Sequence, residues 1–235
     1  MRCKGALAFR FILDDSSLCF VNCHLAAGQT QTSSRNNDVA SIMESDVFPW
    51  SQADDGFVCG GDGSMILDHE FCILNGDLNY RIDTMGRDAV IKAIQSDNLS
   101  RLLERDQLLV TRRRNPTFPL RALGENPITF APTYKYDIGS DTYDTSEKRR
   151  APAWCDRVLF RPSPRIKQVD YRRHELRISD HRPVTAVFRV TVKQVHPSKR
   201  ASTRVRGEER FKSVKEKLGR EAKYSRTLSD CGGLS

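Results

Sequence analysis

Short apolar runs recur along the first part of the chain and predict β-strands. The runs 6–13 (ALAFRFIL) and 17–25 (SLCFVNCHL) are rich in Phe, Leu and Val. They flank the turn-forming residues DDS, a pattern typical of an antiparallel hairpin. Further strands are predicted at 71–74 (FCIL), 156–161 (DRVLFR) and 184–192 (VTAVFRVTV).

Two other segments show helical spacing of their apolar residues. The first, 36–46, should end before Pro49, because proline interrupts a helix. The second, 86–105, repeats apolar residues such as Val90 at roughly helical spacing, with charges between them. Residues 51–64 (SQADDGFVCGGDGS) read as a loop rich in Gly and Asp. The mixture of strands and helices predicts a mixed α/β sandwich.

After Val192 the apolar runs end and basic residues dominate. Residues 193–235 hold twelve Lys or Arg against five Asp or Glu, which leaves 26 basic against 25 acidic residues in 1–192. We therefore expect a folded domain over 1–192 and a basic, disordered tail over 193–235. The tail also has the pattern of an amphipathic helix at about 207–226. The apolar side of that helix would carry Phe211, Val214, Leu218 and Ala222.

The cysteines and the hydropathy indicate a compartment. The chain has seven Cys and no CxxC pair, which argues against a disulfide framework and against a zinc knuckle. It has no run of about 18 apolar residues, and its start, MRCKGALAFRFILDD, shows no signal-peptide cleavage site. We expect a cytoplasmic protein, and the basic tail offers peripheral contact with membranes as an alternative to simple disorder.

Polar side chains cluster beside the end of each of four predicted strands. The clusters are Asn22 with His24, Asp77 with Asn79, Asp156, and Asp180 with His181. Ligand sites of layered α/β proteins lie at strand ends. Carboxylate, amide and imidazole groups are those that a phosphate-ester hydrolase uses to activate water and to neutralise phosphoryl oxygens. The sequence shows neither a nucleophile elbow nor a glycine-rich phosphate loop, which weighs against acyl transfer and nucleotide-dependent transfer.

Each cluster alone has a structural alternative. The residues 76–79 (GDLN) could simply end a strand in a turn. His24 and His181 could be buried structural histidines, and Asp156 could be a structural salt-bridge partner. The order of the clusters and their shared position at strand ends favour a catalytic site.

Five motifs, taken in order, give the sequence a resemblance to a known family. They are NCHL at 22–25, GDLNYR at 76–81, TFAPTYKYD at 129–137, RAPAWCDRVLF at 150–160 and SDHRPV at 179–184. In this order they resemble the inositol polyphosphate 5-phosphatases of the endonuclease/exonuclease/phosphatase superfamily, over about residues 4–192. GDxN and SDH are shared across the superfamily, nucleases included, whereas PAWCDR and PTYKYD are much more specific.

The resemblance implies roles for the clustered residues. Asp77 would orient or deprotonate the attacking water, and Asn79 would donate to the scissile phosphate. His181 would contact that phosphate or the water, with Asp156 holding its ring in one tautomer. His24 would add a further donor to the phosphoryl oxygens.

The resemblance also implies a cation and an anionic substrate. Asp180 would ligate Mg2+ or lie beside it. The 4-phosphate of a phosphoinositide lipid or a soluble inositol phosphate would meet a set of cationic and phenolic side chains. That set is Tyr134, Lys135, Lys148 and Arg150. Arg81 and Arg157 would pair with nearby acids instead, and Asp156 would be paired by both His181 and Arg157.

The implied fold is the four-layer α/β sandwich of the superfamily, incomplete at the N-terminus. The family's N-terminal strands, which bring an Asn and the magnesium-binding Glu, have no counterpart in this sequence, so we expect an N-terminally truncated domain. The implied reaction is removal of the 5-phosphate from lipids such as phosphatidylinositol 4,5-bisphosphate, or from soluble inositol polyphosphates, by metal-assisted attack of water. Two alternatives remain open. One is a catalytically impaired remnant that binds phosphoinositides; the other is a nuclease, which only the basic tail supports. Nucleic acid is not the expected partner.

Overall fold

The computed structural model of the chain describes residues 4–49 and 61–230, with side chains described as far as residue 218. It divides into two units, 1–192 and 193–235, and each is described by itself. Several predicted features fall outside the described residues. They are most of the loop at 51–64, the cysteines Cys3, Cys59 and Cys231, and the side chain of Ala222.

The first unit is built around a four-stranded sheet in the order β1-β2-β3-β4. β1 (Gly5–Leu13) and β2 (Ser16–His24) form the antiparallel hairpin that the sequence predicted. β3 (Phe71–Asp77) lies parallel to β2, and β4 (Asp156–Phe160) runs antiparallel to β3. The apolar runs therefore identified all four strands correctly.

The register of this sheet aligns three residues predicted for the site. His24 of β2 stands opposite Asp77 of β3, and Asp77 stands opposite Asp156 of β4. Gly76, the residue before Asp77, has a φ of 128°, and a Cβ there would lie 2.1 Å from the carbonyl oxygen of Cys23. Only glycine allows this close approach of β3 to β2. The polar strand ends thus meet at one edge of the sheet.

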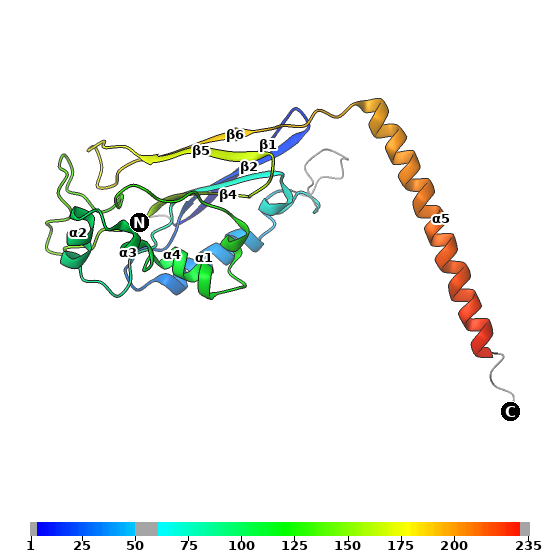
Figure 1. The fold of residues 1–235 in the computed structure, drawn as a ribbon, viewed down its shortest axis with the longest axis horizontal. Helices are drawn as coiled ribbons and strands as arrows, with labels where there is room; N and C mark the ends of the chain where they lie inside the picture. Colours follow the sequence, from blue (N-terminus) through cyan, green and yellow to red (C-terminus); the bar gives the residue numbers. More distant parts are fainter. Residues whose placement is uncertain (1–3, 50–60, 231–235) are drawn as a thin grey trace. The chain divides into compact units, whose positions relative to one another are not determined.

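A two-stranded antiparallel sheet covers one face of the larger sheet (Figure 1). It consists of β5 (Ile166–Arg173) and β6 (Val184–Val190). Phe188 of β6 packs edge-on against Phe160 of β4, with 5.3 Å between ring centroids. The sequence predicted β6 but missed β5, because an irregularity between Gln168 and Asp170 interrupts the alternation of its side chains.

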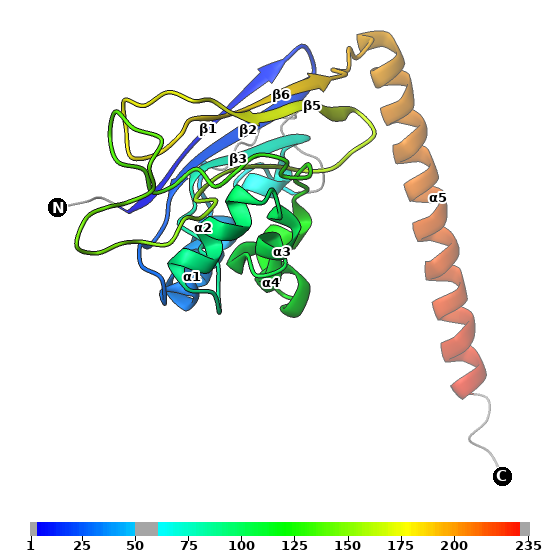
Figure 2. The same cartoon turned by 60° about the vertical axis from the view of Figure 1, so that its left-hand side comes forward.

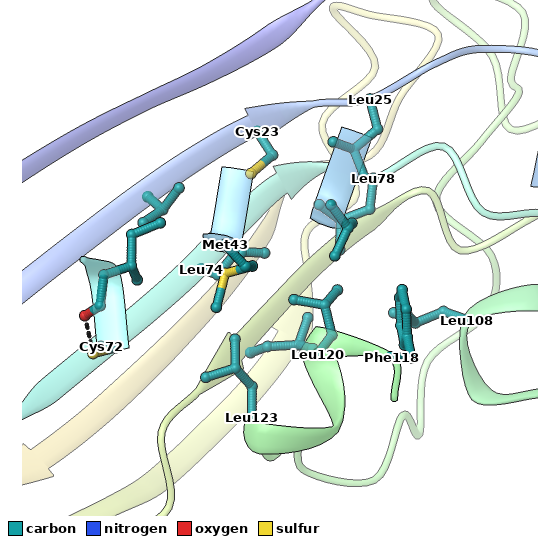
Figure 3. Close-up of a cluster of buried hydrophobic side chains, with 14 of the residues drawn as sticks. Cys23, Leu25, Met43, Cys72, Leu74, Leu78, Leu108, Phe118, Leu120 and Leu123 are labelled. Atoms are coloured by element: carbon teal, nitrogen blue, oxygen red, sulfur yellow. Dashed lines mark hydrogen bonds between the residues drawn. The ribbon is translucent and has the colours of Figure 1, made fainter. Parts of the chain in front are cut away.

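The opposite face of the large sheet carries helices (Figures 1 and 2). α1 (Thr32–Glu44) begins earlier than the predicted residue 36. α1 and α4 (Gln107–Arg114) contribute Met43 and Leu108 to a core cluster that includes Leu74 of β3 (Figure 3). Two 3-10 helices complete this layer. They are η1 (Ile66–Asp68) and η2 (Pro119–Ala122).

The prediction of a single helix over 86–105 is wrong, because this segment forms two helices. The structure divides it into α2 (Arg87–Gln95) and α3 (Leu99–Leu103). Asp97, between them, has a φ of 54°, in the left-handed region that no helix interior uses. The apolar spacing continues across this break because both helices pack against the same cluster, which contains Trp154.

β1 is an edge strand with apolar side chains on both faces. Ala8 packs against the helix-covered core. Leu7 and Phe9, on the other face, are 72% and 52% exposed. The second sheet therefore does not cover this part of β1 among the described residues.

A buried ion triad connects β4 to α4. Arg157 donates to Asp106 at 3.0 Å and to Glu125 at 2.6 Å, and none of the three side chains is more than 3% exposed. The predicted pairing of Arg157 with Asp156 is wrong. Successive residues of a strand point to opposite faces, so Arg157 points toward the helices and Asp156 toward the other side.

The second unit contains one long helix, α5 (Pro197–Asp230). The sequence predicted a disordered tail with at most a helix over about 207–226, and the structure instead has a helix over 197–230. Its abundant Lys, Arg and Glu favour the helical conformation. Every described side chain of α5 is exposed, Phe211 included. None of the helices in the described residues combines the length and apolarity needed to cross a bilayer.

Replacement of Arg157 by Met should destabilise the first unit by about 3–5 kcal/mol. The reason is that Asp106 and Glu125 would remain buried without a cation. Urea unfolding followed by tryptophan fluorescence measures the loss. Arg172→Met is the matched control, since the ion pair of Arg172 with Asp170 lies at the surface. Equal midpoints for the two variants would contradict the importance of the triad.

Candidate active site

The aligned strand ends open into a cavity of about 480 Å³. It is lined by Lys4, His24, Ala27, Asp77, Asn79, Arg81, Tyr134, Lys135, Arg150, Asp180 and His181. Only two of the residues predicted for the site are not on its wall. Asp156 is hydrogen-bonded to His181 behind the wall, and Lys148 lines a neighbouring cavity. The structure therefore brings the predicted residues together.

His181 and Asp156 form a hydrogen-bonded pair. Nδ1 of His181 lies 2.9 Å from Oδ2 of Asp156, and Thr133 Oγ1 donates to the same oxygen at 2.6 Å. Because a carboxylate only accepts, Nδ1 carries the hydrogen. Burial alone would lower the pKa of His181, but the hydrogen bond and the charge of Asp156 outweigh it, and this pKa is raised. His181 therefore stays cationic to a higher pH than an ordinary histidine.

Asp77 lies on the other side of the cavity, with two hydrogen-bond donors and a histidine around its carboxylate. Oδ1 accepts the backbone N–H of Asn79 at 3.0 Å, and His24 Nε2 lies 3.3 Å from Oδ2. Burial, together with repulsion from Asp156, raises the pKa of Asp77. A carboxylate with a raised pKa is a stronger base than an ordinary aspartate, which suits the deprotonation of a water molecule.

Asn79 is placed differently from its predicted role. Its Nδ2 donates to the Leu25 carbonyl and to Asp77 Oδ2, both at 3.1 Å. Its Oδ1 accepts from Arg81 Nη2 at 2.5 Å, and the residue is only 3% exposed. Both amide hydrogens are therefore engaged. In this arrangement Asn79 holds Asp77 in place and has no N–H to offer a phosphate oxygen.

Cations surround the anionic groups of the cavity. Lys4 Nζ lies 2.5 Å from His24 Nε2, and Lys135 Nζ lies 3.1 Å from Asp180 Oδ2. Burial would raise the pKa of Asp180, but the Lys135 hydrogen bond and the charge of His181 outweigh it and lower this pKa. Asp180 thus remains ionised and fixes the Lys135 ammonium at the cavity wall.

Tyr134 lines both this cavity and a larger one of about 990 Å³. Its ring lies 4.6 Å from the His181 ring, and the Arg81 guanidinium lies 4.4 Å from its centroid. Lys148 and Arg150 line the larger cavity, and Arg150 lines both. The two cavities together offer a cationic surface for a ligand with more than one anionic group.

One cationic residue that the sequence set aside has other partners than expected. Arg81 was predicted to pair with an acid, but its side chain contacts Asn79 and Tyr134. Arg149 is mostly exposed and pairs with Asp88 at 3.5 Å. The sequence analysis missed Lys4 and Thr133 as members of the site, although Thr133 lies within the PTYKYD motif.

The described side chains of the cavity do not by themselves form a complete site for a divalent cation. Among the residues that the structure describes, no group of three or more His, Cys, Asp and Glu side chains is placed to hold a metal. Asp180, predicted to ligate or adjoin the metal, faces Lys135, and Asp77 faces Asn79 and His24. Hard cations need about six oxygen ligands or more. The described side chains do not complete such a site.

Comparisons with known proteins indicate the same family that the five motifs resemble. The profile described as "Endonuclease/Exonuclease/phosphatase family 2" matches residues 1–187. A probable inositol polyphosphate 5-phosphatase of Schizosaccharomyces pombe is 52% identical over 205 residues, covering 85% of this chain and 17% of its own length. A synaptojanin of Caenorhabditis elegans is 42% identical over 190 residues, covering 80% of this chain and 16% of its own length. The chain therefore spans less than a fifth of these relatives.

Among solved structures, the chain is similar to the inositol polyphosphate 5-phosphatase domain of a synaptojanin. That structure holds inositol (1,4)-bisphosphate and a calcium ion. The TM-score is 0.68 at 35% identity, and the match covers 92% of this chain and 58% of the other. The mixed α/β fold predicted from the sequence is thereby confirmed.

Asp156→Asn should lower the pKa of His181, because it removes the charge that favours the imidazolium. An NMR titration of the His181 ring measures the change, with Asp170→Asn, on the exposed side of β5, as the control. The raised pKa also implies that the pair stabilises the fold below the ordinary histidine value of 6.5, and that this contribution is lost as pH rises through the raised value. An unchanged titration in Asp156→Asn would contradict this assignment.

Proposed function

The chain belongs to the endonuclease/exonuclease/phosphatase family, and from that membership we propose that its cavity removes the 5-phosphate from an inositol phosphate or a phosphoinositide lipid. The observation that carries the proposal is the meeting of Asp77 and the Asp156–His181 pair in one cavity lined by cations. The names of the relatives support it, and so does the inositol bisphosphate held by the similar domain.

In the proposed reaction, water attacks the phosphorus and the bond from phosphorus to the inositol oxygen breaks. Asp77 accepts a proton from the attacking water, for which its raised pKa suits it. The His181 imidazolium donates to a phosphoryl oxygen, while Asp156 stabilises the cation. Lys135 adds a positive charge near the same oxygens, and His24 adds a hydrogen-bond donor. The inositol oxygen takes a proton from a second water molecule, Asp77 returns its proton to the hydroxide so formed, and inorganic phosphate is released.

The larger cavity is proposed to hold the neighbouring 4-phosphate. Tyr134 and Arg150 line both cavities, so a ring seated between them would present one phosphate to each. Lys135 and Lys148 complete the set that the sequence predicted. A bulky polyanion is bound better by several fixed cations than by one, because each phosphate is met separately.

We propose Mg2+ as the cation of this reaction. Support comes from the calcium ion in the similar domain and from the preference of both ions for oxygen ligands. When bound, such an ion would polarise the phosphoryl oxygens and lower the pKa of water. Its ligands would have to include the substrate phosphate and groups other than the described side chains. The proton transfers proposed for the reaction are made by side chains of the chain and by water.

The test is phosphate release from phosphatidylinositol 4,5-bisphosphate by the 235-residue chain, with and without Mg2+. Asp77→Asn and His181→Ala should each lower kcat by about 100-fold or more, since each removes a proton-transfer or charge-stabilising group. His174→Ala is the matched control, because His174 bonds Thr185 outside the cavity.

Each result of this experiment decides between hypotheses. Release that needs Mg2+ and is lost in both variants supports the phosphatase. A folded chain that releases no phosphate but binds the lipid would contradict it and favour the impaired remnant. Cleavage of DNA without phosphate release would favour the nuclease.

We also propose that α5 places the protein on an anionic membrane, at its cytoplasmic face. Residues 197–218 carry eight Lys or Arg against three Glu. Each basic residue near an anionic surface contributes about 1 kcal/mol of attraction. Phe211, Val214 and Leu218 follow helical spacing, so they share one side of α5, and all three are exposed. The lipid substrate proposed above lies in such a surface.

Sedimentation with vesicles of phosphatidylserine and phosphatidylcholine checks this proposal. We expect binding that falls steeply between 50 and about 200 mM salt, because screening weakens the attraction. Phe211→Ser should weaken it further, whereas Ser213→Ala, on the polar side of the helix, should not. Binding that ignores salt, or that survives deletion of 193–235, would show that α5 is not the membrane contact.

A further inference from the structure

Gln107, the first residue of α4, uses its whole side-chain amide in buried hydrogen bonds. Oε1 accepts from Arg35 Nη2 at 2.5 Å and from the Arg81 backbone N–H at 2.9 Å. Nε2 donates to the Gln29 carbonyl at 2.9 Å and to Asp83 Oδ1 at 2.6 Å. A primary amide has two hydrogens and two acceptor positions, so all four are occupied. The residue is 2% exposed.

Three of these partners belong to the two loops that leave the site strands, and the fourth, Arg35, lies in α1. Gln29 lies in the loop after β2, just beyond His24, and Arg35 holds the same loop through the carbonyls of Ala26 and Gly28 at 3.0 and 2.7 Å. Arg81 and Asp83 lie in the loop after β3, just beyond Asp77. One amide therefore joins both loops, and both loops line the larger cavity.

A chain of contacts leads from Gln107 to the proposed base. The Arg81 backbone is held by Gln107, and the Arg81 side chain donates to the carbonyl and to Oδ1 of Asn79 at 3.0 and 2.5 Å. Asn79 Nδ2 in turn donates to Asp77 Oδ2 at 3.1 Å. Arg81 is 5% exposed and Asn79 is 3% exposed, so a lost partner would leave a largely buried polar group without its hydrogen bond.

We propose that Gln107 is a positioning residue of the site: it sets Asp77 through Arg81 and Asn79, and it fixes the distance between the two loops that bound the substrate cavity. This inference rests on the proposed phosphatase function. Gln107 contacts no reacting atom, because its polar atoms are all bonded within the protein. Its effect on the reaction is therefore one of geometry, which a shift of about 1 Å is enough to disturb.

The experiment compares Gln107→Met with Gln168→Met. Methionine keeps the approximate size of glutamine and removes the hydrogen bonds. Gln168, on β5, is also a buried glutamine, 5% exposed; its Oε1 accepts the backbone N–H of Asn126 at 3.1 Å, and neither residue lines the two cavities. It controls for the general cost of losing a buried amide.

We expect Gln107→Met to lower kcat by about 10–100-fold, as loss of a supporting contact does in other sites. Hydrogen–deuterium exchange should become faster in the backbone of 26–31 and 80–85. Gln107→Glu keeps the acceptor for Arg35 and Arg81 but loses the donor to Gln29 and Asp83. It should therefore recover much of kcat while 26–31 stays loosened.

The exchange measurement does not depend on catalysis. If the unaltered chain releases no phosphate, the proposed function fails, and exchange still decides whether Gln107 holds the loops. If Gln107→Met and Gln168→Met give the same kcat and the same exchange, the inference is overturned. If Gln107→Met does not fold, Gln107→Glu decides: slow exchange at 26–31 in that variant would overturn the inference.

Discussion

The site depends on the register between β2, β3 and β4. His24, Asp77 and Asp156 stand in one row only because the three strands pair as they do. A slip of one residue would turn the side chains of a strand to the opposite face. Gly76 protects this register, since β3 approaches the Cys23 carbonyl more closely than any side chain would allow. The sheet thus fixes the proposed base and the partner of His181 before any loop is added.

The same alternation separates the charges of β4. Asp156 faces the cavity, where His181 compensates it, and Arg157 faces the helices, where it neutralises Asp106 and Glu125. If Arg157 pointed into the cavity, it would compete with His181 for Asp156. Because it does not, the charge of Asp156 acts on His181 and raises its pKa. The buried ion triad and the Asp156–His181 pair thus both follow from the alternation of side chains along β4.

Features that follow from local pattern could be predicted, and those that depend on distant contacts could not. The apolar runs located β1 to β4 and β6, and the polar residues at their ends came together because strand ends share an edge. β5 was missed because its alternation is interrupted after Gln168, and the break at Asp97 is invisible in the apolar spacing. The partners of Arg157 and the engaged amide of Asn79 depend on α4 and on Arg81. Asp106 and Glu125 lie far from Arg157 in the sequence, and although Asn79 and Arg81 share the motif GDLNYR, the motif does not show which way their side chains turn.

The packing of Tyr134 with His181 and Arg81 would link the chemistry of the proposed site to its choice of substrate. The Tyr134 ring lies 4.6 Å from the His181 ring and 4.4 Å from the Arg81 guanidinium, and Tyr134 and Arg81 both line both cavities. Arg81 is held in turn by the network around Gln107. A phosphate at His181 and a second phosphate near Lys148 would therefore stand at a spacing set by buried groups. A long surface side chain such as Lys148 can adapt to a ligand, but the closely packed side chains of Tyr134, His181 and Arg81 cannot. Under the proposed function, discrimination between inositol phosphates that differ in the position of their phosphates would arise from these fixed side chains.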